Sequence, residues 1–406
     1  MPPPSKGGGQ PDRDVRRLLR RHPGSWGTVR PIQVLLKTRD ARQMPIAEPA
    51  VPCPPRGVSA PDVSPAPVDP ADCADWDARV MAQARGSFFH GSAWAKTLQS
   101  AYGFRPVYFT AGEAAGSGSM LPLMEVDSRL TGRRGIALPF TDDCEPLYSD
   151  PAAIQRLIQT ALEFGRARGW KSVEWRGGRE LFGDAPASLS FYGHSVALAA
   201  DEARMFARLD SSVRRAIRKA EKDGVTVTVA QSLEAVKIFY ALQCQTRRKH
   251  GLPPQPFGFF ERIYEHVLSR HLGMIALAHW RGRPIAASVY FQLGTRAVFK
   301  YGASEAAFQH LRGANLVMWE ALKWHARRGA ATLHLGRTSL GNEGLRRFKL
   351  GWGAGEQKIE YVKFDLRQNR FVTETDHATG WHNRVFRVLP TGMSRWIGAV
   401  LYRHCA

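Results

Sequence analysis

The chain has 406 residues, of which 44% are hydrophobic, so it is long enough for two or three domains of ordinary size around a buried core. Its 57 lysine and arginine residues against 36 aspartate and glutamate residues give a formal net charge of +21, which favours an anionic partner: a nucleic acid, an acidic membrane surface or a phosphorylated small molecule. The 5 cysteines are scattered and include no Cys-x-x-Cys pair, which argues against a disulfide framework or a cysteine-based zinc site and fits a reducing compartment.

The N-terminal segment, residues 1–71, is predicted to be disordered. It holds more than half of the chain's 26 prolines, and runs such as Pro52-Cys-Pro-Pro cannot form a regular core element. It lacks the apolar segment of a secretory signal, and no stretch of the chain approaches the roughly 18–20 apolar residues that a membrane-spanning helix needs. We therefore expect a cytoplasmic protein, which could still contact the inner membrane at its surface.

Regular helix and strand signals begin near residue 72 and define a first unit over residues 72–200. Acidic residues at Asp75 and Asp77 mark the start of a helix, and a second helix ends at Gly103, a residue type common at helix C-termini. Runs of β-branched and aromatic residues bounded by turn residues then predict strands, with one helix before the last of them. The predicted strands are 106–110, 118–126, 135–140 and 172–176, and the helix is 152–168.

The second unit, residues 201–370, repeats this order of elements. The helix 213–223 follows a run of helix-capping residues and stops at Gly224, a favourable residue after a helix. Further helices are expected at 236–243, 259–270 and 315–327, and strands at 225–230, 274–280, 285–293, 296–301 and 331–336. Three strands, a helix and a strand in this order resemble the acyl-CoA N-acyltransferase (GNAT) architecture. The predicted fold class is therefore α/β, with two tandem GNAT-like subdomains of mixed sheets flanked by helices.

A polar segment with several glycines, after the last of these strands, is the first candidate for chemistry. The strand ends in Gly336-Arg337, a loop follows, and a short helix presents Arg346, Arg347 and Lys349 within one turn. Loops at the carboxyl ends of strands are where open α/β sheets place ligands, and an ammonium there can stabilise an oxyanion that develops on an acyl carbonyl. Arg337 and Arg346 would hold an anionic part of a substrate. The alternative is a solvated basic surface without a chemical role.

Two other segments could bind substrate. On the helix 213–223, the basic residues Arg214, Arg215 and Lys219 could form an anion-binding face for phosphates or for a tRNA acceptor stem, or they could simply be a solvated helix surface. Tyr301, at the end of a predicted central strand, could be a general acid or a stacking wall. It could equally be a core aromatic next to a turn glycine.

Several common catalytic and cofactor motifs are missing. GNAT enzymes hold the pyrophosphate of coenzyme A with a Gln/Arg-x-x-Gly-x-Gly/Ala turn, but the equivalent stretch here, residues 309–315, has one glycine, shifted by one position. The sequence has no His-x-x-x-His or His-Glu-x-x-His spacing, no Gly-x-Ser-x-Gly elbow and no P-loop. We therefore expect no metal and no resident cofactor, and an acyl donor other than acetyl-coenzyme A is favoured.

Further short motifs follow one another along the first and the second half of the chain. Those of the first half are Trp76-Asp77, Phe89-His90 with Trp94, Leu121-Pro122-Leu123, Leu138-Pro139-Phe140, and Glu174 with Arg176. Those of the second half are 213–224, 246–253, 301–304, Asn315 with Trp319, Gly336-Arg337, Arg347-Phe348-Lys349, 386–390 and 401–404. From about residue 72 onward, this ordered set resembles the FemAB family, and within it the FemAB-like proteins of exopolysaccharide and PEP-CTERM (exosortase) gene systems.

The resemblance implies N-acyl transfer to an amine in cell-envelope or exopolysaccharide biosynthesis, as in the family's peptidyltransferases of the peptidoglycan bridge. Lys349 matches the lysine that is proposed to stabilise the transition state in those enzymes, and Phe348 precedes it. Asn315 and Tyr301 would line the cleft. The implied donor is aminoacyl-tRNA or acyl-CoA, and the implied acceptor is phosphorylated or lipid-linked. The chain departs from its relatives at Asp142-Asp143, which stands where they are often rich in glycine.

Two further functions fit parts of the sequence. A non-catalytic scaffold of envelope-polysaccharide export would hold the inner leaflet with its basic surface. Residues 371–406 would then be a basic amphipathic helical tail that lies on the membrane, although the same tail could instead pack on the second unit. An RNA-binding protein is the other possibility, without a recognisable RNA-binding motif to support it. DNA is not expected as a partner.

Overall fold

The computed structural model describes residues 66–112, 118–375, 386 and 389–404. All of them belong to one compact unit, residues 59–406. The segment predicted to be disordered lies outside the described residues as far as residue 65, and so does the part of the predicted tail between residues 376 and 385. Within the described residues, no helix has both the length and the apolar character needed to span a bilayer.

The first half of the described chain has short strands and three helices longer than one turn. Its helices are α1 (Trp76–Ala82), α2 (Ser92–Tyr102) and α3 (Pro151–Ala167), with the 3-10 helices η2 (Phe88–His90) and η3 (Arg179–Phe182). Its strands are β1 (Arg105–Pro106), β2 (Phe109–Ala111), β3 (Ser119–Leu121), β4 (Met124–Val126), β5 (Arg134–Ile136), β6 (Ser172–Arg176) and β7 (Leu189–Ala197). Asp150 caps α3 by accepting a hydrogen bond from the Ala152 N–H.

The second half has longer strands. Its helices are α4 (Glu202–Ala207), α5 (Ser211–Lys222), α6 (Leu233–Lys249), α7 (Phe257–Ile263), the π-helix η4 (Tyr264–Leu268), the 3-10 helix η5 (Ala306–Leu311), α8 (Gly313–Arg327), α9 (Glu343–Leu350) and α11 (Thr391–Leu401). Its strands are β8 (Val225–Ala230), β9 (Gly273–Trp280), β10 (Arg283–Leu293), β11 (Arg296–Ser304), β12 (Thr332–Ser339), β13 (Gly355–Asp365) and β14 (Arg370–Phe371). On α5 the predicted apolar face is confirmed, because Val213, Ile217 and Ala220 are buried.

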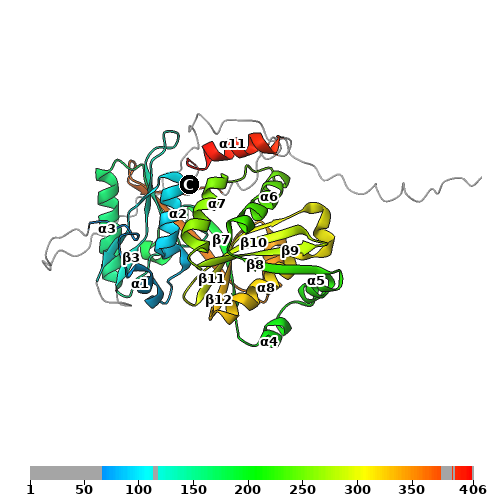
Figure 1. Cartoon of the computed structure of the whole chain (residues 1–406). Helices are drawn as coiled ribbons and strands as arrows, with labels where there is room; N and C mark the ends of the chain where they lie inside the picture. Colours follow the sequence, from blue (N-terminus) through cyan, green and yellow to red (C-terminus); the bar gives the residue numbers. More distant parts are fainter. Residues whose placement is uncertain (1–65, 113–117, 376–385, 387–388, 405–406) are drawn as a thin grey trace, which may run out of the picture. The chain divides into compact units, whose positions relative to one another are not determined.

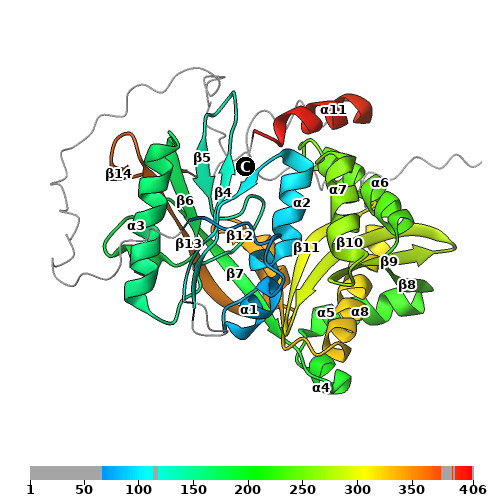
Figure 2. The same cartoon turned by 60° about the vertical axis from the view of Figure 1, so that its left-hand side comes forward.

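One 12-stranded sheet runs through both halves, in the order β1-β4-β5-β6-β13-β7-β12-β11-β10-β9-β8, with β14 beside β13. Figure 2 shows this sheet passing from β5 and β6 through β13 and β7 to β11 and β10. The strands of the two halves interlock at its centre: β13, from the second half, lies between β6 and β7, and β7 lies between β13 and β12. Both β6 and β7 would therefore lose a hydrogen-bonded neighbour if β13 were removed.

Helices cover both faces of the second-half sheet (Figure 1). α5 and α8 pack on one face, where Ile217 and Leu322 are buried in a single cluster. α6 and α7 pack on the other face together with α2 of the first half, and Phe239, Phe259 and Trp94 share this second cluster. Because a helix of the first half completes this core of the second, the halves share a hydrophobic cluster as well as one sheet.

Two strand pairs of the main sheet are parallel, and one of them opens. β11 pairs with β12 only from Arg296–Thr332 to Val298–His334, although both strands continue beyond these residues. On β11, Lys300 is the extra residue of a bulge, because Tyr301 pairs with Val289 while Phe299 pairs with Tyr290. On β12, a second irregularity brings Gly336 into the left-handed region, with φ of 76°. Both bulges lie where the two strands have ceased to pair.

The structure departs from the predicted elements at several places. The predicted strand 135–140 ends at Ile136, because Leu138 and Phe140 have φ values of 51° and 61° and cannot continue a strand. The predicted strands 106–110 and 118–126 are each interrupted and form two short strands. The predicted helix 259–270 changes from α to π geometry at residue 264. The strands β7 and β13 were not predicted.

Candidate active site

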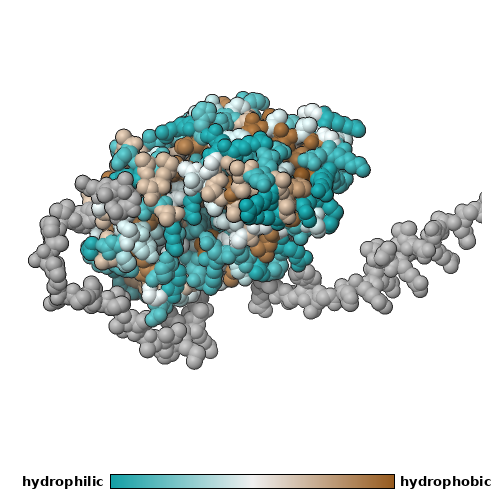
Figure 3. All heavy atoms as spheres, turned by 90° about the horizontal axis from the view of Figure 1, so that it is seen from below, coloured by the Kyte–Doolittle hydropathy of each residue, from teal (hydrophilic) through white to brown (hydrophobic). Residues whose placement is uncertain are grey.

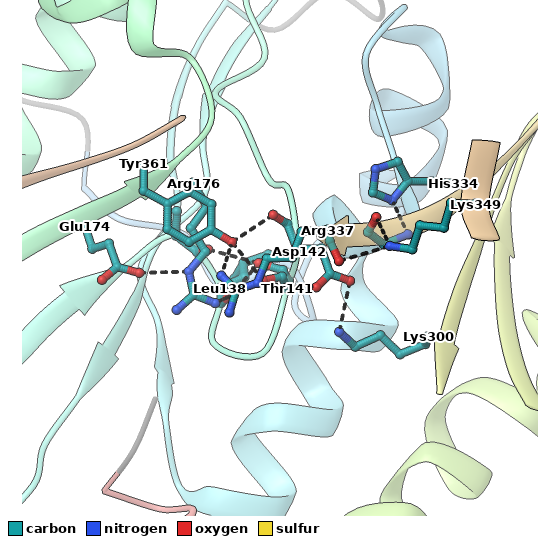
Figure 4. Close-up of polar contacts among 12 residues, drawn as sticks. Leu138, Thr141, Asp142, Glu174, Arg176, Lys300, His334, Arg337, Lys349 and Tyr361 are labelled. Atoms are coloured by element: carbon teal, nitrogen blue, oxygen red, sulfur yellow. Dashed lines mark hydrogen bonds and ion pairs between the residues drawn. The ribbon is translucent and has the colours of Figure 1, made fainter. Parts of the chain in front are cut away.

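A group of charged side chains fills the gap where β11 and β12 diverge (Figure 4). At its centre is Asp142, from the loop 137–145 that follows β5 in the first half. Its Oδ2 atom lies 3.5 Å from Nζ of Lys300 on β11, and its Oδ1 atom lies 3.9 Å from Nε of Arg337 on β12. A carboxylate of the first half thus bridges two strands of the second.

Lys349 is buried in the same group, with 4% of its surface exposed. It is the buried residue of α9, a short helix capped by Asn342, whose side chain accepts a hydrogen bond from the Leu345 N–H. The Lys349 ammonium donates to the carbonyl oxygens of Gly336, at 2.7 Å, and of Arg337, at 3.0 Å. These two bonds fix the ammonium at the opening between the strands and leave one N–H for another acceptor.

Gly336 gives this arrangement its space. A Cβ atom at this position would lie 3.3 Å from Asp142 Oδ2 and 3.9 Å from Lys349 Nζ, and the positive φ would strain any side chain. The predicted Gly336-Arg337 step is therefore a backbone requirement of the site: it turns the carbonyl oxygens of β12 toward the lysine.

The environment sets the protonation states of these groups. Burial lowers the pKa of Lys349 to about 8, against the opposing charge of Asp142. Burial also lowers the pKa of Lys300, again opposed by Asp142. For Asp142, burial alone would raise the pKa, but Lys300 and Arg337 outweigh it and the pKa is lowered. Burial lowers the pKa of the adjacent His334 to about 4. At neutral pH, Lys349 is therefore mostly protonated and His334 is neutral, beside the ionised Asp142 carboxylate.

Two aromatic rings and a tyrosine hydroxyl position Arg337. Its guanidinium carbon lies 4.2 Å from the ring centroid of Phe191 on β7 and 5.3 Å from that of Tyr361 on β13. Its Nη1 atom donates to the Tyr361 hydroxyl at 2.7 Å, and this hydroxyl donates to the backbone carbonyl of Asp142 at 2.8 Å. The interlocked strands β7 and β13 thus orient both Arg337 and the Asp142 loop.

Arg176 on β6 holds the loop 137–145 in its unusual shape. Its Nη1 atom donates to the carbonyl oxygens of Leu138 and Thr141, both at 3.2 Å, and its Nε atom pairs with Glu174 at 2.8 Å. Leu138, like Phe140, has a positive φ, a conformation that costs on the order of 1–3 kcal/mol for such residues. The buried arginine therefore supports a strained loop that delivers Asp142.

The sequence-predicted residues fall into two sets. Lys349 and Arg337 lie together in the charged group. Arg346 lies outside it: its guanidinium makes a two-point contact with Glu356, at 2.8 and 2.9 Å, and stacks on Tyr192. Phe348, with 41% of its surface exposed, is on the outer side of α9.

The other predicted residues are spread over the second half. Tyr301 packs among the aromatic rings of α6 and α7, with its ring centroid 5.5 Å from that of Phe260. Asn315 is half-buried in the first turn of α8. The basic residues of α5 face outward, where Lys219 pairs with Asp223 at 2.6 Å and Arg215 bonds to a serine, while Arg214 is half-buried. None of these makes a hydrogen bond or ion pair with Asp142 or Lys349 among the described residues.

Sequence reasoning missed Lys300, His334, Tyr361 and the role of Asp142. One signal was available for Lys300, since a lysine in the middle of an otherwise apolar strand is rarely left without a partner. Asp142 differs from the residue that is common in related sequences, but no local pattern predicts its contact with Lys300, which is 158 positions away. In the part of the chain that the structure describes, no group of three His, Cys, Asp or Glu side chains is placed to hold a metal ion.

The comparisons with known proteins concern the fold. Residues 207–354 match the family model described as an acetyltransferase (GNAT) domain, a segment that contains β11, β12 and α9. The structure is similar to that of FemX, with a TM-score of 0.59 and 14% sequence identity, over 70% of this chain and 94% of that chain. No curated protein matches the chain in sequence.

Two more solved structures are similar at lower scores. L-PGS from Bacillus licheniformis has a TM-score of 0.48 and 13% identity, over 84% of this chain and 98% of that chain. A tandem GNAT protein from the clavulanic acid biosynthesis pathway has a TM-score of 0.47 and 10% identity, over 74% of this chain and 98% of that chain. Together with the sheet described above, the FemX likeness confirms the predicted fold class, a mixed α/β protein of the tandem GNAT type.

The ion pair between Arg176 and Glu174, which holds Arg176 against the loop 137–145, can be tested by substitution. Arg176→Met removes the ion-pair partner of the Glu174 carboxylate, so we expect a loss of about 3–5 kcal/mol in the free energy of unfolding. The double variant Arg176→Met/Glu174→Gln should recover part of this loss, because no unpaired charge remains. Denaturant unfolding measures both, with the exposed Arg166→Met as a control expected to change little. A double variant as unstable as the single one would contradict the pairing.

Proposed function

We propose that the chain is an N-acyltransferase that moves an activated acyl or aminoacyl group onto an amine, with Lys349 facing the acyl oxygen. One observation carries the proposal: the ammonium of a buried lysine is fixed by two backbone carbonyls at the point where β11 and β12 diverge. The match of residues 207–354 to an acetyltransferase domain supports it, and so does the resemblance of the Arg347-Phe348-Lys349 step to the FemAB family.

The charge of the site suits this reaction. The amine nitrogen attacks the acyl carbonyl carbon, a C–N bond forms, and negative charge develops on the carbonyl oxygen before the C–O or C–S bond to the leaving group breaks. Lys349, Lys300 and Arg337 face a single carboxylate, so positive charge is in excess where the oxygen would lie. Fixed charges in a site with little water stabilise such an oxyanion without reorganising at the moment of reaction.

The connection between β11 and α8 supports an aminoacyl ester over acyl-CoA as donor. Residues Ala306–Leu311 form a 3-10 helix, and Arg312 has a φ of 58° before α8 begins at Gly313. The turn that holds the pyrophosphate of coenzyme A presents successive backbone N–H groups and needs its glycines to let the ligand approach closely. An ester of the aminoacyl-tRNA kind does not require that turn.

The acceptor is proposed to be an amine-bearing, phosphorylated or lipid-linked intermediate of cell-envelope or exopolysaccharide biosynthesis. This finer proposal rests on the FemAB resemblance alone. A non-catalytic scaffold or an RNA-binding protein would have no use for a buried ammonium of lowered pKa, because basic surface residues serve those functions.

Replacing Lys349 tests the proposal. Purified protein is incubated with a panel of aminoacyl-tRNAs and acyl-CoAs and a mixture of primary amines, and the products are identified by mass spectrometry. Lys349→Met should reduce the transfer rate about 100- to 1,000-fold, because a charge donor to the oxyanion is lost while side-chain volume is kept. The exposed Lys237→Met on α6 is the matched control and should react like wild type. Transfer that survives Lys349→Met, or wild-type protein that transfers from no donor, contradicts the proposal.

The pH dependence gives a second test of the same lysine. Only the protonated form stabilises an oxyanion, so the rate should fall as pH rises through about 8, the pKa of Lys349. Asp142 raises that pKa, so Asp142→Asn should move the alkaline decline to lower pH. Initial rates of both proteins from about pH 6 to about pH 10 check this shift. If the decline stays in place, another group titrates.

A further inference from the structure

A cavity of about 400 Å³ lies apart from the Lys349 ammonium, against the centre of the sheet. Its floor comes from β7, β11, β12 and β13, and its walls come from residues 85–90, 143–145 and 177–180 of the first half. The volume is in the range of small-molecule sites, roughly 300–1,000 Å³. His334 lines it and accepts a hydrogen bond from the Gly336 N–H, so the cavity borders the charged group described above.

Most charged side chains of the cavity are paired with one another. Arg85 lies 2.8 Å from Glu145 and 3.6 Å from Glu180, and Lys358 lies 2.6 Å from Glu360. Because Arg85 is shared by two carboxylates, these contacts leave an excess of one negative charge in the lining.

Three charged side chains of the lining have no ion-pair partner among the described residues: Asp143, Arg179 and Arg296. Arg179 donates a hydrogen bond to the Gly183 carbonyl, which leaves Asp143 and Arg296 for a ligand. Burial, together with the charges of Glu145 and Asp142, raises the pKa of Asp143 to about 7. The positive charge of Arg296 opposes this rise, so Asp143 and Arg296 are close enough to interact. A buried carboxylate without a partner is stabilised when a cation reaches it.

The backbone around Asp143 leaves room for its carboxyl group and is held in place by His90. Gly177 has a φ of 107°, and a Cβ atom there would lie 2.6 Å from Asp143 Oδ1. His90 anchors the neighbouring loop: its Nδ1 accepts from the Ser87 N–H, so its Nε2 donates to the Glu145 carbonyl at 2.8 Å. Burial lowers the pKa of His90 to about 4, which keeps the ring neutral for this role.

We infer that this cavity binds a small zwitterion of the amino-acid class, with its ammonium on Asp143 and its carboxylate on Arg296. Free carboxylate and free guanidinium in one small cavity match the two charges of such a ligand, whereas a singly charged ligand would leave one of them unpaired. That such a zwitterion is the amino-acid end of the acyl acceptor rests on the proposed function: its ammonium would lose one proton before the C–N bond forms, and a second as the acyl C–O or C–S bond breaks and the leaving group is protonated. The binding itself does not.

Calorimetric titration and saturation-transfer NMR with free L-amino acids test the cavity, with ethylamine and propionate as singly charged comparators. At least one L-amino acid should bind about tenfold or more tightly than either comparator. Asp143→Asn and Arg296→Gln should each remove about that factor, while Arg281→Gln, an exposed arginine in the turn between β9 and β10, should not. Lys349→Met should bind as wild type does, so a failure of transfer and a failure of this site are separate results. Absence of amino-acid binding, or equal binding by both cavity variants, overturns the inference.

Helix α11 carries an independent feature, because three of its large apolar side chains are exposed. It packs on the body through small residues: Ser394 is buried, and a Cβ atom on Gly398 would lie 2.0 Å from the Pro254 carbonyl oxygen. Met393, Trp396 and Val400 are 50%, 69% and 42% exposed. Their spacing of three and four residues places them on one side of the helix.

The surroundings of α11 are basic and include another exposed apolar residue. Arg403 just beyond the helix and Arg129 in the turn between β4 and β5 are exposed, whereas the exposed Arg395 of the helix lies over the Tyr240 ring, 5.3 Å from its centroid. That turn contacts the end of α11 through hydrogen bonds to the His404 carbonyl and presents Leu130, which is 65% exposed. By contrast, the face seen from below in Figure 3 is mainly hydrophilic, with hydrophobic side chains in small separate patches.

We propose that this face of α11 lies on an anionic bilayer, with Trp396 at the interface and the arginines beside the lipid phosphates. Interfacial helices combine an outward apolar stripe, an aromatic anchor and basic flanks, and the net charge of +21 adds a long-range attraction. The predicted alternatives for the tail are thereby combined, because the helix packs on the body and still offers its apolar side to a membrane.

Flotation with lipid vesicles tests this face. Wild-type protein should float with phosphatidylglycerol-containing vesicles and much less with pure phosphatidylcholine, and Met393→Ser/Trp396→Ser should lose most of the binding. Val229→Ser, at an exposed apolar position on β8, is the matched control. Absence of flotation, flotation unchanged in the double variant, or a wild-type dimer that the double variant abolishes would each overturn the proposal in favour of another occupant or none.

Discussion

The carboxylate of Asp142 is the interaction on which the candidate site depends. Without it, Lys300 and Lys349, whose side chains are buried, would lie beside the partly exposed Arg337 with no opposite charge between them, and burying unpaired charge costs several kcal/mol per ion. One carboxylate compensates only part of this charge. The site is thus stable enough to fold and still electropositive enough to attract a developing oxyanion.

The interlocked sheet explains how a loop of the first half can serve strands of the second. β13 lies beside β6, which places Tyr361 opposite Arg176, and these two residues hold the backbone of the loop 137–145, which carries Asp142. Two tandem subdomains joined only by a linker would leave the loop and the strands free to move apart. A shared sheet and a shared core keep their separation fixed, which catalysis by positioning requires.

Local patterns in the sequence predicted the elements that local physics determines. α5 follows from the periodic burial of Val213 and Ile217 and from the glycine that ends it. β13 escaped prediction because charged residues occupy much of it and its burial arises from strands that are distant in the sequence. Lys349 could be proposed from a short motif and a resemblance. Its partner Asp142 could not, since only the tertiary fold brings the two halves together.

The central claim is that an activated acyl group binds where Lys349 lies, and the molecules retained by an impaired enzyme test it most directly. Mass spectrometry of whatever co-purifies with the Lys349→Met variant should detect an acyl ester or thioester, held by the intact remainder of the site and no longer turned over. Retention of only unacylated lipid, free RNA or no small molecule at all, under conditions that preserve such esters, would contradict the account.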